Sequence, residues 1–276
     1  MKSIQLMILA LVLALAMGCK KDIQPGNDPN FTITSHSDKG MKSLEKKVEV
    51  FGIPIYANKS VDDKRLLHAA NVMAQYLDND EDGNVDNQAV VDQLINNNAR
   101  LMMWKRKRDL IKPGLRGNID SGQDLGNNET RPEWHANGKT GQFDAALEEV
   151  WHLISHVGYT NAYPNAFGES AGSTLCNAMD IARGGRFTEI PSSYPSEAWY
   201  TYDDKTCGYE CMATEYFYWA LTSMLGAQEN RLDEIGQEWD LNTRELVEER
   251  DPAVFELLTD PQYKLPTVMP DGTYRH

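Results

Sequence analysis

The sequence predicts a mainly helical domain of the α+β class, in which a minor sheet accompanies several amphipathic helices. Apolar residues recur with helical spacing along most of the chain, whereas only one stretch has the β-branched and aromatic composition of a strand. Of the 276 residues, 41% are hydrophobic and 25% are charged, which is typical of a folded globular chain. We therefore expect a single compact helical domain over residues 31–276.

The expected elements follow in chain order. Residues 48–57 (VEVFGIPIYA) predict a strand that is broken at Pro54, because proline cannot donate a hydrogen bond to a sheet. Residues 105–137 are polar and glycine-rich with little periodicity, which indicates a loop. Two helices are expected to stop at glycines, one at Gly158 and one at Gly184. The predicted helices are 61–77, 85–103, 142–157, 172–183, 208–225, 242–249 and 252–258.

The N-terminus has the pattern of a bacterial lipoprotein signal. A 14-residue, largely apolar run from Ile4 to Met17 follows Lys2, and it is too short to span a bilayer. It ends in LAMGC, which resembles the lipobox of bacterial lipoproteins. The resemblance implies that residues 1–18 are removed as a signal peptide and that lipid is attached to Cys19, which would hold the protein at a membrane.

The residues after the expected lipidation site predict a flexible tether and indicate where in the cell envelope the protein is held. Residues 19–30 contain Pro25, Gly26 and Pro29, which indicates a flexible segment. The charged residues directly after Cys19 resemble the signal that carries some bacterial lipoproteins to the outer face of the outer membrane. We therefore expect a lipid-anchored protein of the bacterial cell envelope, in the outer membrane and exposed at the cell surface.

The charge of the chain argues against one class of partner, and its cysteines predict a disulfide. The chain carries 41 acidic against 27 basic residues, a formal net charge of −14, which argues against a nucleic-acid partner. The sequence contains no glycine-rich phosphate loop. In an oxidising compartment we expect Cys207 and Cys211 to form a disulfide across a tight turn, which leaves Cys176 unpaired.

Residues 78–86 (DNDEDGNVD) form an acidic loop between two predicted helices. Calcium prefers six to eight oxygen ligands, and alternating carboxylates on a tight loop can converge on one ion. Gly83 permits the sharp turn. The sequence predicts a structural Ca²⁺ site, and the alternative is an acidic loop that stays solvated. The expected ligands are the side chains of Asp78, Asp80, Asp82 and Asp86 and the backbone carbonyl of Asn84.

This loop resembles those of EF-hands, dockerins and thrombospondin type-3 repeats over nine residues. At the twelfth position Ala89 stands where an EF-hand has its bidentate glutamate. Another residue, for example Asp92, is then needed to complete the ligand shell.

The predicted helix 142–157 carries metal-binding side chains on its polar face. Glu148, Glu149, His152 and His156 fall opposite an apolar arc. Glu149, His152 and His156 have the spacing i, i+3, i+7, so they project in nearly one direction. Two imidazoles and a carboxylate on one helix face suit Zn²⁺ or another first-row metal.

The same helix resembles the HExxH active-site helix of zincin metallopeptidases, with Glu148 in place of the first histidine. The resemblance implies a zincin-like fold, with Glu149 as the general base and Glu148 and His152 as metal ligands. In the gluzincin branch a further glutamate comes from a later helix. Glu215, in a segment otherwise lined with aromatic residues, matches that role best.

The departure from the zincin pattern affects the expected chemistry. Glu169 and Asp180 are alternatives to Glu215 as the downstream ligand. A glutamate in place of histidine makes the ligand set harder, which favours Mn²⁺ or Fe²⁺ more than in an ordinary zincin. It also weakens the activation of a bound water. A helix that simply presents its polar face to water would explain the same residues without a metal.

Two functions follow from these features. The first is a lipid-anchored, zincin-like metallohydrolase, a metalloprotease that acts on a protein or peptide substrate and is stabilised by calcium. In this function His135 or Tyr216 would stabilise the oxyanion. The second is a non-catalytic, calcium-binding surface protein. It would bind a protein or glycan partner through exposed aromatic residues at Trp199, Tyr200 and Tyr202.

Overall fold

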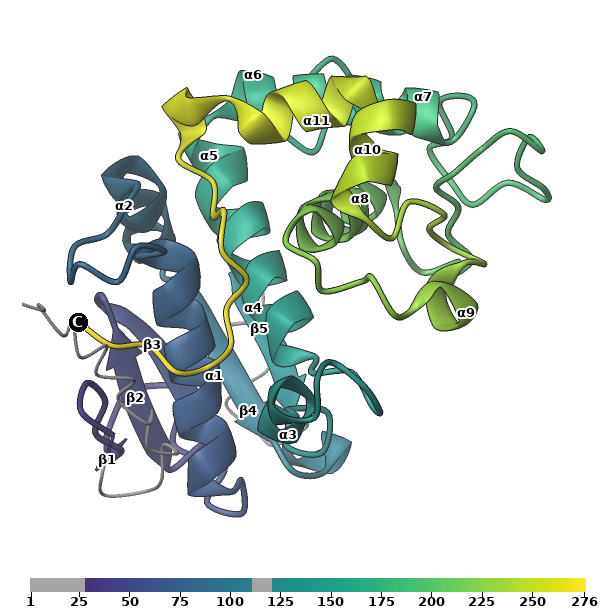
Figure 1. Ribbon diagram of the computed structural model, residues 1–276. Coiled ribbons are helices and arrows are strands. Elements are labelled where there is room, and N and C mark those ends of the chain that lie inside the picture. The colour runs from purple at the N-terminus through teal and green to yellow at the C-terminus, as the bar shows by residue number, and fades with distance from the viewer. Residues whose placement is uncertain (1–27, 111–120) are drawn as a thin grey trace, which may run out of the picture.

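The computed structural model describes residues 28–110 and 121–276, and Figure 1 shows their arrangement. The expected signal peptide 1–18, the expected lipid attachment at Cys19 and residues 19–27 of the expected tether lie outside the described residues. Within the described ranges no helix is long and apolar enough to cross a membrane. The described chain forms a compact, mainly helical α+β fold with a small sheet, and the predicted fold class is confirmed.

The sheet has five strands that lie side by side in chain order. The first three are antiparallel, whereas the last three run parallel to one another. The parallel step from β3 to β4 is made through two helices, α1 (Asp63–Leu77) and α2 (Gln88–Asn96). The strands are β1 (Thr34–Ser35), β2 (Lys46–Val50), β3 (Ile53–Ala57), β4 (Arg100–Trp104) and β5 (Gly122–Gly126).

The strand break expected at Pro54 is wrong, because the chain turns at Phe51 and Gly52 instead. Both turn residues have positive φ, 47° and 84°, as a two-residue hairpin turn requires. Pro54 lies inside β3 opposite Glu49, and β4 pairs with β3 only from Ile55 onward. The missing proline N–H therefore does not interrupt the ladder between β3 and β4.

The prediction of a helix over residues 85–103 is wrong for the second half of this range. α2 ends at Asn96, Asn98 adopts a left-handed conformation with φ 54°, and the chain continues as β4. Asparagine tolerates this conformation better than most residues, so the helix can end there. Leu101 and Met103 then point into the core between the sheet and the helices.

The described part of the loop expected over residues 105–137 contains three elements that the prediction missed, of which the first is a short 3-10 helix, Lys107–Asp109. β5 lies in this segment and pairs along its whole length with β4. Its sequence, GQDLG, lacks the β-branched and aromatic residues of a typical strand, so pairing rather than propensity determines it. The short helix α3 (Pro132–Ala136) follows, with proline in its first turn.

The helix that carries the candidate metal ligands is longer than predicted. α4 (Ala146–Leu153) lies beside α1 and β5 and continues as a π-helical segment, Ile154–Tyr159, and then as α5 (Thr160–Ala162) (Figure 1). The predicted stop at Gly158 is therefore wrong. A Cβ atom at Gly158 would lie 2.7 Å from Cγ1 of Val90 on α2. Glycine is needed here for close helix packing, not for termination.

The rest of the described chain is helical. The long aromatic helix α8 packs against α4, α7, α10 and α11 (Figure 1). The structure joins Cys207 and Cys211 in a disulfide at the start of α8, whereas Cys176 is unpaired and buried in α7. These helices are α6 (Pro164–Phe167), α7 (Thr174–Ala182), α8 (Tyr209–Met224), α9 (Leu232–Ile235), α10 (Arg244–Arg250) and α11 (Pro252–Thr259).

Both faces of the sheet are covered. On one face, alternate strand residues such as Ile55 and Leu101 join the main core with α1 and α4. On the other face, Tyr56 and Met102 pack with Met41 from the segment before β2. Because side chains alternate along each strand, the two faces of the sheet contribute to two different hydrophobic clusters.

The C-terminal segment (residues 264–276) runs along α1 back towards the sheet (Figure 1). Gln75 and Asn79 accept hydrogen bonds from backbone N–H groups of this segment, at 2.8–2.9 Å. Asn30, expected in the flexible tether, donates to the Tyr274 carbonyl at 3.0 Å. The last residues of the predicted tether are thus part of the fold, and the tether prediction is wrong for them.

Candidate metal centre

Three predicted ligands meet where α4 contacts α8. Glu148 and His152 lie one turn apart on α4, and Glu215 faces them from α8. One ligand atom of each residue lies within 4.8 Å of the other two. The distance between His152 Nε2 and Glu215 Oε2 is 3.4 Å. Packing of the two helices therefore brings together side chains that are far apart in the sequence.

The His152 imidazole is enclosed by protein. His152 is only 7% exposed, and its Nε2 atom has no hydrogen-bond partner among the described residues. The Tyr218 ring packs edge-on against the imidazole, with 5.4 Å between the ring centroids. A buried nitrogen without a partner is costly, because it has given up its contact with water. A cation between this nitrogen and the two carboxylates would supply the missing interaction.

Glu149, the expected general base, lies beside this group and not within it. Its Oε2 atom is 3.6 Å from Nδ1 of His152, on the other side of the ring from Glu215. Glu149 also accepts a hydrogen bond from the side chain of Gln123 on β5. The carboxylate is thus held next to the ligand atoms by a neighbouring strand.

His156 and the two alternative downstream acids lie outside the ligand group. The His156 ring is half-exposed, and its Nδ1 is 2.6 Å from Oε2 of Glu169. Asp180 pairs instead with Arg186, at 2.9 Å. The structure therefore brings Glu215 to Glu148 and His152, and it does not bring His156, Glu169 or Asp180 into this group.

The surroundings of the site are acidic. Burial, together with Glu149 and Glu215, raises the pKa of the Glu148 carboxyl to about 8. Burial also raises the pKa of Glu238 to about 7, with a contribution from Glu215. Burial alone would lower the pKa of His152, but Glu215 and Glu149 raise it well above its usual value. The carboxylates thus favour positive charge at this point.

The aromatic residues expected to be exposed are buried or half-buried, so this expectation is wrong. Tyr200 is fully buried, and its hydroxyl donates to a backbone carbonyl at 2.7 Å. Trp199 donates its indole N–H to Asp251 at 2.9 Å. Tyr202 lies beside Glu215, and burial together with that carboxylate raises the pKa of the Tyr202 hydroxyl. These rings pack within the domain and do not form a docking platform.

The two expected oxyanion donors have other partners, so that expectation is also wrong. The Tyr216 hydroxyl donates to Asp251 at 2.6 Å, and His135 Nε2 lies 2.9 Å from Asp144. The prediction also missed Gln123 and Tyr202 as neighbours of the site. Neither residue has a sequence signal, because each reaches the site from a strand or loop only through tertiary packing.

Three of the five predicted calcium ligands converge. Oxygen atoms of Asp78, Asp80 and Asp82 lie within 4.8 Å of one another. Asp78 is fully buried at the end of α1, and its carboxylate accepts hydrogen bonds from the Gly83 N–H and the Tyr274 hydroxyl. Gly83 has φ 88°, which confirms that this position needs glycine.

The Asp86 side chain is not part of this gathered group. The Asp86 carboxylate accepts the backbone N–H of Asn79 at 2.6 Å, and burial raises its pKa. The Asn84 side chain donates to Asp82 at 3.1 Å. Asp92, the candidate for completing the shell, accepts instead from an amide side chain on α2 at 2.8 Å. The loop therefore presents three gathered carboxylates, while Asp86 and Asp92 point elsewhere.

Comparison with known proteins does not indicate a function for this chain. No protein-family model, curated protein or solved structure matches the chain. Function is therefore inferred from the geometry of the site.

Proposed function

We propose that this chain is a lipid-anchored protein of the bacterial envelope with a zincin-like metal centre that hydrolyses peptide bonds. The observation that supports the proposal is the convergence of Glu148, His152 and Glu215 at the contact between α4 and α8. One imidazole and two carboxylates bind Zn²⁺, and their oxygen-rich character also suits Mn²⁺ or Fe²⁺. The buried His152 Nε2, which faces Glu215 at 3.4 Å without a hydrogen bond among the described residues, fits this role.

The residues around the centre suit peptide hydrolysis. A divalent metal supplies Lewis-acid activation of water at such a site. Glu149 would act as the general base that takes a proton from the attacking water, and Gln123 holds its carboxylate in place. β5 has β4 as its one partner strand in the described sheet, so its outer edge offers backbone groups with which an extended peptide can pair.

Calcium in the loop 78–86 supports this function by stabilising the domain. The gathered carboxylates of Asp78, Asp80 and Asp82 provide a site for a hard cation. Their loop contacts the C-terminal segment through Tyr274, so bound calcium would stabilise both.

The metal centre is tested by measuring zinc binding to the full chain, purified without a polyhistidine tag and kept in excess Ca²⁺. We expect His152→Gln to weaken zinc binding at this centre by more than about 100-fold, because loss of a ligand costs more than loss of a second-shell contact. The matched control is His156→Gln. His156 lies on the same continuous helix but outside the ligand group, so this variant should bind zinc as the parent does. Equal affinity of the parent and His152→Gln would contradict the metal centre.

The hydrolytic step is tested separately with casein and internally quenched peptides. Glu149→Gln is expected to keep the metal content and melting temperature of the parent but to lose cleavage, since a general base does not hold the metal. Cleavage at the parent rate by Glu149→Gln would refute this role. A metal-loaded parent that cleaves none of these substrates would refute the peptidase function and leave the metal centre intact.

A second function is a non-catalytic, calcium-binding surface protein that binds a protein or glycan partner. The convergence of Asp78, Asp80 and Asp82 favours it as much as it favours the first function. The two functions differ in metal content, because the second predicts calcium as the sole bound metal. A parent that binds calcium but no transition metal would select the second function.

A further inference from the structure

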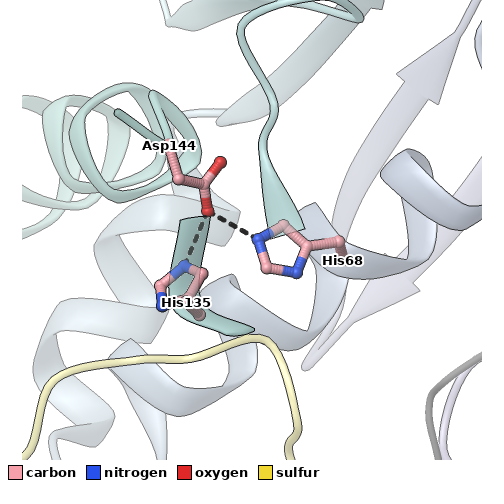
Figure 2. Close-up of side chains that lie close together, drawn as sticks. All are labelled: His68, His135 and Asp144. Atoms are coloured by element: carbon pink, nitrogen blue, oxygen red, sulfur yellow. Dashed lines mark hydrogen bonds and ion pairs between the residues drawn. The ribbon is translucent and has the colours of Figure 1, made fainter. Parts of the chain in front are cut away.

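A second group of metal-type ligands lies at the start of α4, one turn before Glu148. His68 comes from α1, His135 from α3 and Asp144 from the residues just before α4. Figure 2 shows both imidazoles directed at one carboxylate oxygen: Nε2 of His68 lies 2.6 Å and Nε2 of His135 lies 2.9 Å from Oδ2 of Asp144. Three elements therefore meet through donor atoms that metals prefer.

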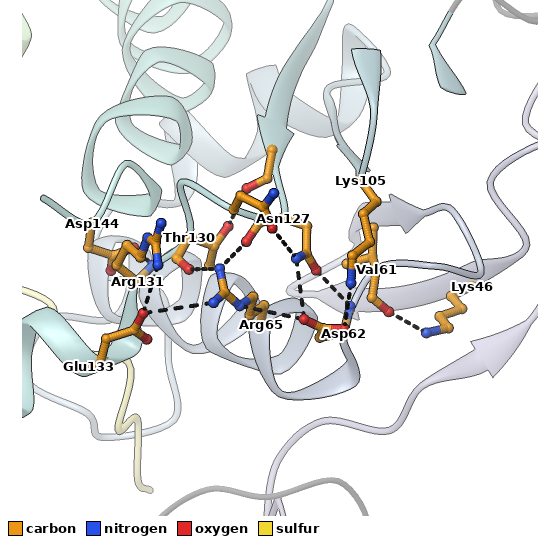
Figure 3. A network of polar contacts seen from close by, with 12 residues as sticks. Lys46, Val61, Asp62, Arg65, Lys105, Asn127, Thr130, Arg131, Glu133 and Asp144 are labelled. Carbon is orange, nitrogen blue, oxygen red and sulfur yellow. Dashed lines mark hydrogen bonds and ion pairs between the residues drawn. The ribbon is translucent and has the colours of Figure 1, made fainter. Parts of the chain in front are cut away.

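Backbone N–H groups orient the Asp144 carboxylate on the side opposite the two histidines. Its other oxygen, Oδ1, accepts the N–H of Arg131 at 2.6 Å and that of Ala146 at 3.3 Å. Figure 3 shows that the segment around Arg131 is itself fixed to α1, where Arg65 donates to the Thr130 carbonyl at 2.8 Å. The carboxylate is thus held with Oδ2 towards the histidines. Outer contacts of this kind orient the ligands of metal sites.

The His68, His135 and Asp144 side chains are buried, and one of their ring nitrogens has no hydrogen-bond partner among the described residues. Asp144 is fully buried, and His68 is 4% exposed. The C-terminal segment covers His68 so closely that a Cβ atom at Gly272 would lie 2.0 Å from its Nδ1. His135 Nδ1 is buried and has no hydrogen-bond partner among the described residues. This atom is the ring nitrogen that does not contact Asp144, since Nε2 makes that contact, so it lies outside the set of donor atoms that would bind a metal.

The spacing of the donor atoms is close to that around a tetrahedral ion. Ligands at about 2.0–2.1 Å from zinc stand about 3.3 Å apart, so each histidine Nε2 would need to move only several tenths of an ångström further from Oδ2 of Asp144. Two neutral imidazoles and one carboxylate give a ligand set with a single negative charge, which suits a divalent ion in a buried position.

We propose that His68, His135 and Asp144 bind a second divalent transition metal, with Zn²⁺ as the best match, in a structural site separate from the centre between α4 and α8. The ion would join α1, α3 and the start of α4, with His68, His135 and Asp144 as its protein ligands. It shares no ligand with the proposed catalytic centre, so it can be present or absent independently of that centre.

The test counts zinc ions bound per chain. The full chain, without a polyhistidine tag, is equilibrated with Zn²⁺ in excess Ca²⁺, and bound zinc is measured by mass spectrometry of the metal. We expect two zinc ions per parent chain and one in each of His68→Gln and His135→Gln, which act from different helices. The matched control is His36→Gln, because His36 is a buried histidine outside both groups; it should keep two.

The outcomes separate this inference from the proposed function. Unchanged zinc content in both His68→Gln and His135→Gln overturns the second site. A parent with one zinc ion that is lost in His152→Gln and kept in His68→Gln also overturns it. A parent with one zinc ion that is lost in His68→Gln and His135→Gln but kept in His152→Gln supports the second site and refutes the centre between α4 and α8.

Discussion

The two nitrogens of His152 have different surroundings. Nε2 faces Glu215 in the ligand group, whereas Nδ1 faces Glu149 at 3.6 Å. A carboxylate near Nδ1 favours the tautomer that carries its proton there, which leaves Nε2 free to bind a metal. Glu149 is therefore placed to orient its neighbour as well as to act as a base.

The first prediction concerns the residue that holds Glu149. Gln123→Ala removes the side-chain donor to this carboxylate, so we expect kcat for peptide cleavage to fall by about 10- to 100-fold through loss of positioning. Zinc content should not change. The measurement is steady-state kinetics with a quenched peptide, and Gln93→Ala on α2 is the control. Parent-like kcat in Gln123→Ala would show that the contact does not position the base.

At the residue scale, periodicity predicts only part of the site. Glu148 and His152 can be predicted because residues four apart share a helix face, and Glu215 because a carboxylate among aromatic residues is costly unless it is bound. His68 and Asp144 are 76 residues apart and meet only through tertiary packing. No local pattern in a single sequence encodes that contact, which is why the second group was missed.

Among the elements, the close contact between α2 and the π-helical segment depends on Gly158. Overpacking costs about 1–3 kcal/mol, whereas alanine favours a helix interior over glycine by roughly 1 kcal/mol. A Cβ at Gly158 would lie 2.7 Å from buried Val90, so we expect Gly158→Ala to lower the free energy of unfolding by about 1 kcal/mol. Gly208→Ala is the control, because its Cβ would meet no atom within 4 Å. Denaturant unfolding that gives Gly158→Ala parent stability would refute the packing argument.

The calcium loop is a second element with a direct test. Asp80→Ala combined with Asp82→Ala removes two of the gathered carboxylates, so the melting temperature in Ca²⁺ should fall to that of the EDTA-treated parent. A matched double variant, Asp233→Ala with Glu234→Ala on α9, removes the same charge elsewhere and should keep the response to calcium. A parent that melts at the same temperature with and without EDTA would show that the loop is merely acidic.

The sequence predicts elements well where one strong pattern acts alone. α1, α7 and α8 end within a few residues of their predicted bounds, because apolar spacing and glycines mark them. β5 could not be predicted, since it owes its conformation to pairing with β4. Gly158 was misread because a glycine needed for close packing has the same sequence signal as one that ends a helix.

At the scale of the whole molecule, the first described residues and the candidate metal centre lie apart. Asn30, the last residue of the expected tether, donates a hydrogen bond to the Tyr274 carbonyl close to the C-terminus. In Figure 1 the contact between α4 and α8 lies well to the right of that end of the chain.

Lipid attachment itself gives a prediction for the whole protein. Cys19→Ser removes the thiol that acylation requires, so the variant should move from the detergent-rich to the aqueous phase in a cloud-point partition experiment. Cys176→Ser, which changes a buried cysteine, is the control and should stay in the detergent phase. If Cys19→Ser also stays with the detergent, the protein is not held by lipid at this residue.

Crystals of the full chain soaked in Zn²⁺ test the central claim most directly, through anomalous diffraction at the zinc edge. We predict an anomalous peak between α4 and α8, about 2.0–2.2 Å from His152 Nε2 and from oxygens of Glu148 and Glu215. The same peak should vanish in His152→Gln crystals and remain in His156→Gln crystals. A zinc-soaked parent crystal that shows no peak among Glu148, His152 and Glu215 would contradict the metal centre and the peptidase function built on it.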